Sequence, residues 1–181
     1  KWVEPEHPAE FVPGTVDQFI WQSERDGFNH LYLYGLDGKV IRQLSKGNFP
    51  VTTFYGFSTD GSRCFYQTAD ESGMNRYLWA CSLKDGKTER LNTEEGVHNG
   101  TFSPEGDWVV DVFSNLATPR LVNVQKTSST AERKLIYGSK NPLEEYQIGT
   151  TLFAKIPSPG GMMLNARLIL PTNYDSGKKY P

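Results

Sequence analysis

The stretch Phe57-Ser58-Thr59-Asp60-Gly61 decides the fold of this 181-residue chain, because it recurs 45 residues later as Phe102-Ser103-Pro104-Glu105-Gly106. Each copy is a polar turn that leads into a run rich in aromatic or β-branched residues, at 64–68 and 109–113. A first copy lacks the turn motif but has the corresponding strand at 19–23. The chain therefore contains three copies of one pattern. An internal repeat of this kind must be considered first in assigning the fold.

Each copy continues through a polar loop to another strand, and two copies then turn through Asp37-Gly38 or Asp85-Gly86 into an outer strand. Asp-Gly between apolar runs is a strong hairpin signal, because these residues tolerate the positive φ angles of the turn. The third copy is degraded in its last part. A repeat of about 45 residues with four short strands has the size of a β-propeller blade. The strand-by-strand match favours a propeller over a β-sandwich with coincidental spacing.

We therefore predict an all-β fold: a partial β-propeller of about three four-stranded antiparallel blades, at about 9–53, 54–97 and 98–140. Known propellers close with 4 to 8 blades, so further blades are expected before Lys1. The pattern changes after Tyr137, and a hairpin without the turn motif follows within 141–181. We expect this hairpin to open a different domain, which the sequence truncates.

The composition excludes several classes of partner. Basic residues number 19 against 21 acidic ones, and they are scattered, so neither a nucleic acid nor an anionic membrane is indicated. No apolar stretch approaches the roughly 18 residues of a membrane span. We predict no metal and no cofactor, since metal ligands at close spacing are lacking.

The catalytic signals of a hydrolase are also missing from the sequence. It has no Gly-x-Ser-x-Gly elbow to present a serine nucleophile. Its three histidines, His7, His30 and His98, are far apart and are interpreted as surface or turn residues. The acidic pairs 94–95 and 144–145 could bind an ammonium group, but solvated surface is the favoured interpretation. Asn99-Gly100-Thr101 is a glycosylation sequon and equally a turn, with the turn favoured.

Two cysteines are placed to face each other across a hairpin. If the chain turns at Ser72-Gly73, residues whose numbers sum to 145 are opposed, which pairs Cys64 with Cys81. Directly opposed residues have Cα atoms roughly 4.5–5.5 Å apart, which a disulfide can bridge. A possible disulfide and a reduced pair both remain open, and a bond would suit an extracytoplasmic protein.

Two stretches resemble a known family. Ser23-Glu24-Arg25-Asp26-Gly27-Phe28-Asn29-His30-Leu31-Tyr32 resembles a blade signature of the dipeptidyl peptidase IV branch of the prolyl oligopeptidase-type serine peptidases. The tail at 168–181, from Leu168-Ile169-Leu170-Pro171 to Lys178-Lys179-Tyr180-Pro181, is similar to that family's entry into its α/β-hydrolase domain. The resemblance covers the whole chain, and the two motifs stand in the expected order.

The resemblance implies an eight-bladed propeller that caps an α/β-hydrolase domain, in an enzyme that releases dipeptides ending in Pro or Ala from peptide N-termini. It places the catalytic triad and the oxyanion tyrosine after Pro181, and the paired glutamates that bind the substrate amine before Lys1. Glu94-Glu95 is not that pair, because it lies in a different blade. No catalytic residue of the family is therefore expected in this chain.

One short loop has an implied role at the substrate. Trp2-Val3 resembles a Trp-Val beside the family's pocket for the second substrate residue, which makes Trp2, Glu4 and Glu6 candidate pocket residues. The family continues with basic and aromatic residues where this chain has Glu4-Pro5-Glu6-His7, so an ordinary connection between blades is the alternative.

The resemblance also implies the partners. These are peptide substrates, the remaining blades and the hydrolase domain of the same chain, and a second copy in a homodimer, with an extracytoplasmic (periplasmic or secreted) location. The rival functions are an oligopeptidase or acylaminoacyl peptidase of the same group, and a non-enzymatic propeller that serves as a binding scaffold.

Overall fold

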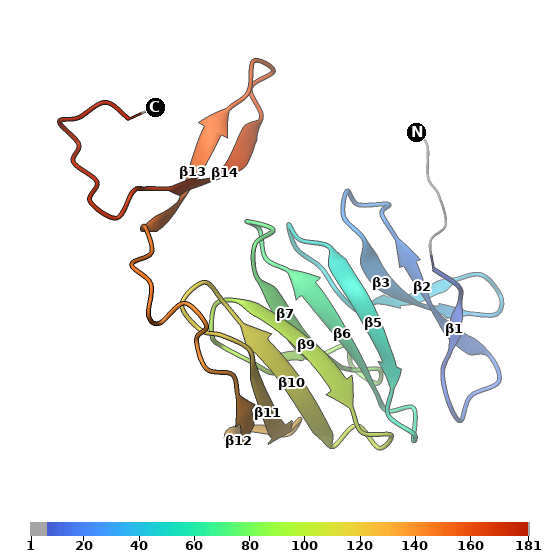
Figure 1. The fold of residues 1–181 in the computed structure, drawn as a ribbon. Coiled ribbons are helices and arrows are strands. Elements are labelled where there is room, and N and C mark those ends of the chain that lie inside the picture. The colour runs from blue at the N-terminus through green and yellow to red at the C-terminus, as the bar shows by residue number, and fades with distance from the viewer. Residues whose placement is uncertain (1–6, 181) are drawn as a thin grey trace. The chain divides into compact units, whose positions relative to one another are not determined.

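The computed structural model describes residues 7–180 and contains fourteen strands and no helix in that range. The chain divides into two compact units, one ending at Ser139 and the other beginning at Lys140. The first unit contains three groups of four strands, which follow one another in chain order from blue to yellow-brown in Figure 1. Neighbouring strands within each group are antiparallel.

The first group is a separate sheet in the order β1-β2-β3-β4. Its strands are β1 (Glu10–Phe11), β2 (Gln18–Ser23), β3 (His30–Gly35) and β4 (Val40–Gln43). The second group comprises β5 (Val51–Phe57), β6 (Arg63–Ala69), β7 (Arg76–Ser82) and β8 (Thr88–Arg90). The third comprises β9 (Val97–Phe102), β10 (Trp108–Ser114), β11 (Leu121–Lys126) and β12 (Ser129–Gly138). A single parallel pair, Arg76 with Val97, joins these last two groups.

The second unit contains one antiparallel hairpin, β13 (Thr151–Pro157) and β14 (Met163–Ile169). Its turn closes with the Ser158 N–H donating to the Met162 carbonyl at 2.8 Å. The second unit begins after the third group ends, in the region where the sequence pattern changes.

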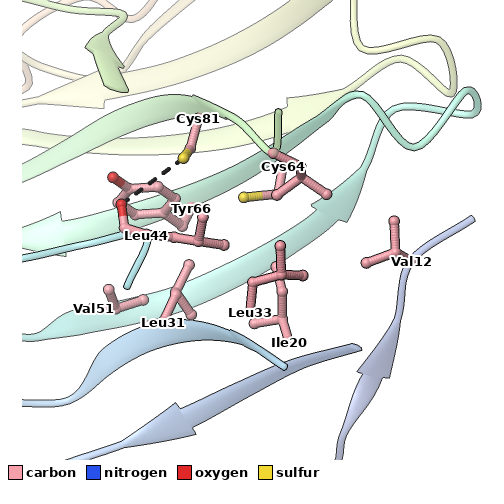
Figure 2. Close-up of a cluster of buried hydrophobic side chains, with 10 residues drawn as sticks. Val12, Ile20, Leu31, Leu33, Leu44, Val51, Cys64, Tyr66 and Cys81 are labelled. Atoms are coloured by element: carbon pink, nitrogen blue, oxygen red, sulfur yellow. Dashed lines mark hydrogen bonds between the residues drawn. The ribbon is translucent and has the colours of Figure 1, made fainter. Parts of the chain in front are cut away.

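The second group has a core on each of its faces, because successive side chains of a strand point to opposite sides. On one face, Cys64, Tyr66 and Cys81 pack with apolar residues of the first group, as Figure 2 shows. On the other face, Phe65 and Leu78 pack with Val109 of the third group. Strand β6 is buried along almost its whole length for this reason.

The repeated turn motif contacts the preceding group at its glycine. Gly61 and Gly106 have φ angles of 67° and 75°, in the left-handed region that favours glycine. A Cβ on Gly61 would lie 2.1 Å from the Pro13 carbonyl oxygen, and one on Gly106 would lie 2.5 Å from the Phe65 ring. Consecutive turns are also bonded, because the Thr59 N–H donates to the Pro104 carbonyl at 2.9 Å. The motif therefore turns the chain and also allows neighbouring groups of strands to pack closely at its glycine.

Three sequence-based interpretations are wrong. His30 and His98 are 1% and 0% exposed, not surface residues. Asn99-Gly100 lies within β9, opposite Val112 and Asp111, and is not a turn. Gly100 is closely packed there, because a Cβ would lie 2.9 Å from the Phe102 ring and 3.1 Å from a Leu78 methyl group. The sequence suggested a turn because Asn-Gly has a local preference for turns. Packing within the sheet overrides that preference here.

Candidate functional site

The predicted pocket residues Trp2, Glu4 and Glu6 lie outside the described residues, so their role stays a prediction. The other candidate features are of four kinds: a hollow on the first sheet, two buried histidine clusters, the two acidic pairs and the cysteine pair.

The hollow measures about 440 Å³ and is lined by Ala9, Phe19, Trp21, Arg25, Tyr34 and Gly38. Phe19 and Tyr34 stand opposite each other on β2 and β3, with stacked rings 5.5 Å apart. Ile20 and Leu33, one position along each strand, point to the opposite face and are buried. The alternation of the sequence therefore creates an apolar core on one face and an aromatic surface on the other.

Arg25 lies above this aromatic surface. Its guanidinium is 4.3 Å from the centre of the Tyr32 ring and donates a hydrogen bond to the Tyr34 hydroxyl. Burial and the neighbouring Asp26 carboxylate raise the pKa of Tyr32 to about 12, so its phenol stays protonated. The hollow can contact apolar or aromatic groups through its rings, but none of its lining residues is placed to act as a nucleophile.

His98 and Asp111 form a buried pair that the sequence analysis missed. Nδ1 of His98 is 2.8 Å from Oδ2 of Asp111, and both side chains are at most 1% exposed. The two residues are 13 positions apart on β9 and β10, where His98 stands opposite Phe113 and Asp111 is its diagonal neighbour on the same face. Only the strand register could have revealed the pair.

This pair has two of the three groups of a serine hydrolase triad but not their accessibility. Nε2 of His98, which would face a serine, is 3.0 Å from the Glu94 carbonyl oxygen instead. The imidazole also stacks on Phe113, with ring centres 4.5 Å apart. Both ring nitrogens of His98 are therefore engaged with fixed partners inside the blade. His98 is thus a structural member of the buried cluster and is not placed to take a proton from a serine.

Arg133 completes the cluster from β12. Its guanidinium lies 3.3 Å from Oδ2 of Asp111 and donates a second hydrogen bond to the Glu94 carboxylate. Partial burial alone would raise the pKa of Glu94, but hydrogen bonding to backbone N–H groups and the Arg133 charge hold it below the usual value. Glu94 and Glu95 are both exposed, as the sequence had suggested, and the Glu94 carboxylate also pairs with Arg133.

The second buried histidine is satisfied locally. Nδ1 of His30 is 3.0 Å from the Ser45 hydroxyl, and Nε2 is 3.1 Å from the Gly47 carbonyl oxygen. The Ser45 oxygen also accepts the Leu31 N–H at 2.9 Å. Both ring nitrogens therefore have partners, and His30 has no free nitrogen for catalysis.

The remaining candidates are simpler. Glu144 and Glu145 are exposed in the second unit. Within residues 7–180, no group of three or more His, Cys, Asp or Glu side chains could hold a metal ion. No helix in the described part of the chain is long and apolar enough to cross a membrane.

Cys64 and Cys81 face each other across β6 and β7, as the sequence predicted. Both are fully buried, and both are free thiols in the structure. The hydrogen bond to Cys81 and burial raise the pKa of the Cys64 thiol well above its usual value. A reactive cysteine requires a stabilised, accessible thiolate, so the folded pair is not a catalytic site.

Comparison with known proteins relates this arrangement to a family. The sequence model of the dipeptidyl peptidase IV (DPP IV) N-terminal region matches residues 1–120. The chain belongs to the dipeptidyl peptidase IV family. Dipeptidyl peptidase 4 of Trichophyton equinum is 26% identical over 170 residues, which is 91% of this chain and 22% of the relative. The chain thus spans about a fifth of the length of this curated relative.

Solved structures of family members confirm the predicted fold. A Bacteroides ovatus protein named as a dipeptidyl aminopeptidase IV superposes with a TM-score of 0.89 and 31% identity, covering all of this chain and 28% of that one. Dipeptidyl peptidase 4 of Porphyromonas gingivalis gives 0.83 and 29%, covering 96% and 24%. The three four-strand groups are open β-sheets of a partial propeller, as predicted.

Proposed function

We propose that this chain is the late propeller segment of a serine-type exopeptidase that releases X-Pro or X-Ala dipeptides from peptide N-termini. The observation that supports the proposal is the match of residues 1–120 to the DPP IV N-terminal region, together with relatives named dipeptidyl peptidase 4. In this proposal the chain positions and filters peptides, and the catalytic triad lies elsewhere in the full-length protein.

The side-chain geometry agrees with this division of labour. Hydrolysis of an amide by such an enzyme needs a nucleophile, a base that takes its proton and donors for the oxyanion. Both strand histidines, His30 and His98, have their ring nitrogens engaged with fixed partners. Neither of these two histidines is therefore placed to act as the base for a serine, and we expect the chain by itself to be inactive.

The test compares the full-length protein with the isolated chain on Ala-Pro and Gly-Pro chromogenic amides. We expect the full-length protein to hydrolyse both, a serine-directed inhibitor to abolish the activity, and the isolated chain to show no inhibitor-sensitive turnover. Preference for an N-acetylated amino acid or for internal bonds would identify an acylaminoacyl peptidase or an oligopeptidase instead. No hydrolysis by the full-length protein would favour a binding scaffold.

Two further assignments belong to the same proposal. Residues 141–181 would open the α/β-hydrolase domain, and the loop with Trp2, Glu4 and Glu6 would border the pocket for the second substrate residue. Replacing both glutamates with Ala in the full-length enzyme should change KM for dipeptide substrates without changing the melting temperature. Unchanged kinetics would remove this loop from the site.

A further inference from the structure

We propose that Cys64 and Cys81 oxidise to a disulfide that joins β6 and β7, the two central strands of the second blade. The proposal is independent of the peptidase function, because it rests on the register and surroundings of these two residues. It adds a covalent modification site at the packing surface between the first and second blades.

The register places the two cysteines directly opposite each other on β6 and β7. The Leu83 N–H donates to the Ser62 carbonyl at 2.9 Å, and the Asp70 N–H donates to the Asn75 carbonyl at 3.2 Å. Hydrogen-bonded pairs alternate with non-bonded pairs along an antiparallel ladder, so Cys64 and Cys81 also form a hydrogen-bonded pair. Such pairs have Cα atoms about 5.5 Å apart, near the separation most common in disulfides.

The surroundings favour a neutral, apolar cross-link. Figure 2 shows both cysteines within the buried cluster, beside Leu31, Leu44 and Tyr66. The Cys81 thiol has the Leu44 carbonyl oxygen as a weak acceptor, 3.8 Å from Sγ. A disulfide has no donor to satisfy and no charge to bury, so the apolar cluster accommodates it without a desolvation cost.

The oxidation must take place before the blades close. Disulfide exchange requires a thiolate in contact with the oxidant, and neither cysteine is exposed in the folded chain. We infer that the bond forms in the exposed β6–β7 hairpin during folding. Two S–H bonds break and one S–S bond forms; the two electrons and two protons released reduce the disulfide of glutathione or of a thiol–disulfide oxidoreductase to two thiols.

The experiment refolds the full-length protein in oxidised glutathione, or in dithiothreitol without oxidant. Each sample is quenched in acid, denatured, alkylated with a maleimide and digested for mass spectrometry. We expect the oxidised sample to contain a peptide pair linked through Cys64 and Cys81 and lacking label, and the reduced sample to carry a label on both. The single variants Cys64→Ser and Cys81→Ser should each leave the other cysteine labelled.

Two results would overturn the proposal. One is maleimide label on both cysteines after refolding in oxidised glutathione, and the other is linkage of either cysteine to a different partner. The decisive measurement uses the unmodified sequence, so it does not depend on whether a variant folds. Once formed, the disulfide should also resist reduction by dithiothreitol in the folded protein and be reduced only after denaturation, because the buried cluster excludes the reductant.

Discussion

Replacing Asp111 with Asn tests whether the buried charge cluster holds the third blade to its own outer strand. Asn has nearly the same shape and can still accept one hydrogen bond from His98, but it removes the negative charge that faces both His98 and Arg133. Breaking a buried ion pair by removing one partner costs about 3–5 kcal/mol. Arg133 is 19% exposed and keeps Glu94 as a partner, so we expect the lower end, about 3 kcal/mol.

A matched control exists in the same blade. Asp107 also pairs with an arginine, at 3.2 Å from Arg63, but its side chain is 69% exposed. Exposed ion pairs contribute about 0–1 kcal/mol, so Asp107→Asn should have little effect. The two variants make the same chemical change and differ in burial.

The assay is native-state amide hydrogen exchange of the full-length protein, followed on peptides that cover β9 and β10. The rate of amide exchange through local opening reports the free energy of that opening. A decrease of about 3 kcal/mol in this free energy corresponds to roughly 150-fold faster exchange. Equal exchange rates in the two variants, or a loss below about 1 kcal/mol in Asp111→Asn, would refute the reasoning that this cluster is a buried ionic network.

Three further predictions concern the core, the turn motif and pH. Leu33→Ala, at a side chain 2% exposed, should cost about 2–5 kcal/mol in chemical denaturation. Gly106→Ala should destabilise more than Gly14→Ala in thermal melts; both have positive φ, but only the first places a Cβ against a ring. Hydrogen bonds from the Ser58 hydroxyl and from the N–H and hydroxyl of Ser62 lower the pKa of Asp60 to about 2. Its contribution to stability should therefore be complete above about pH 4 and fade as pH falls towards 2, and NMR titration of the carboxyl carbon would measure this pKa.

The strand order and the central register could be predicted because local signals determine them. The repeated turn and the Asp-Gly hairpins are short-range features, and once one turn is located the whole ladder follows. The pairing of Cys64 with Cys81 required only the position of the turn after β6. The pairing could be deduced because successive side chains of a strand point to opposite faces. A shift of the register by one residue would therefore have moved core side chains to the wrong face.

The buried cluster could not be predicted, because its members come together only through tertiary packing. His98, Asp111 and Arg133 lie on three different strands, β9, β10 and β12, and β12 pairs with β11 through two register shifts. A polar residue in a strand usually marks the solvent face. Here the polar side chains compensate one another, so His98, which the sequence suggested to be at the surface, and Asp111 are among the most buried residues.

The three blades also differ in how well sequence alternation predicts burial. Strand β6 is buried on both sides and contains the apolar run Cys64-Phe65-Tyr66, as expected for a strand flanked by two neighbours. Strand β10 has the same character, yet Trp108 and Val110 are 43% and 38% exposed, whereas Val109 on the other face is fully buried. The exposed face of β10 therefore has the composition of a buried one. In our proposal a further blade covers it, which would give β10 the two-sided packing that β6 has between its neighbours.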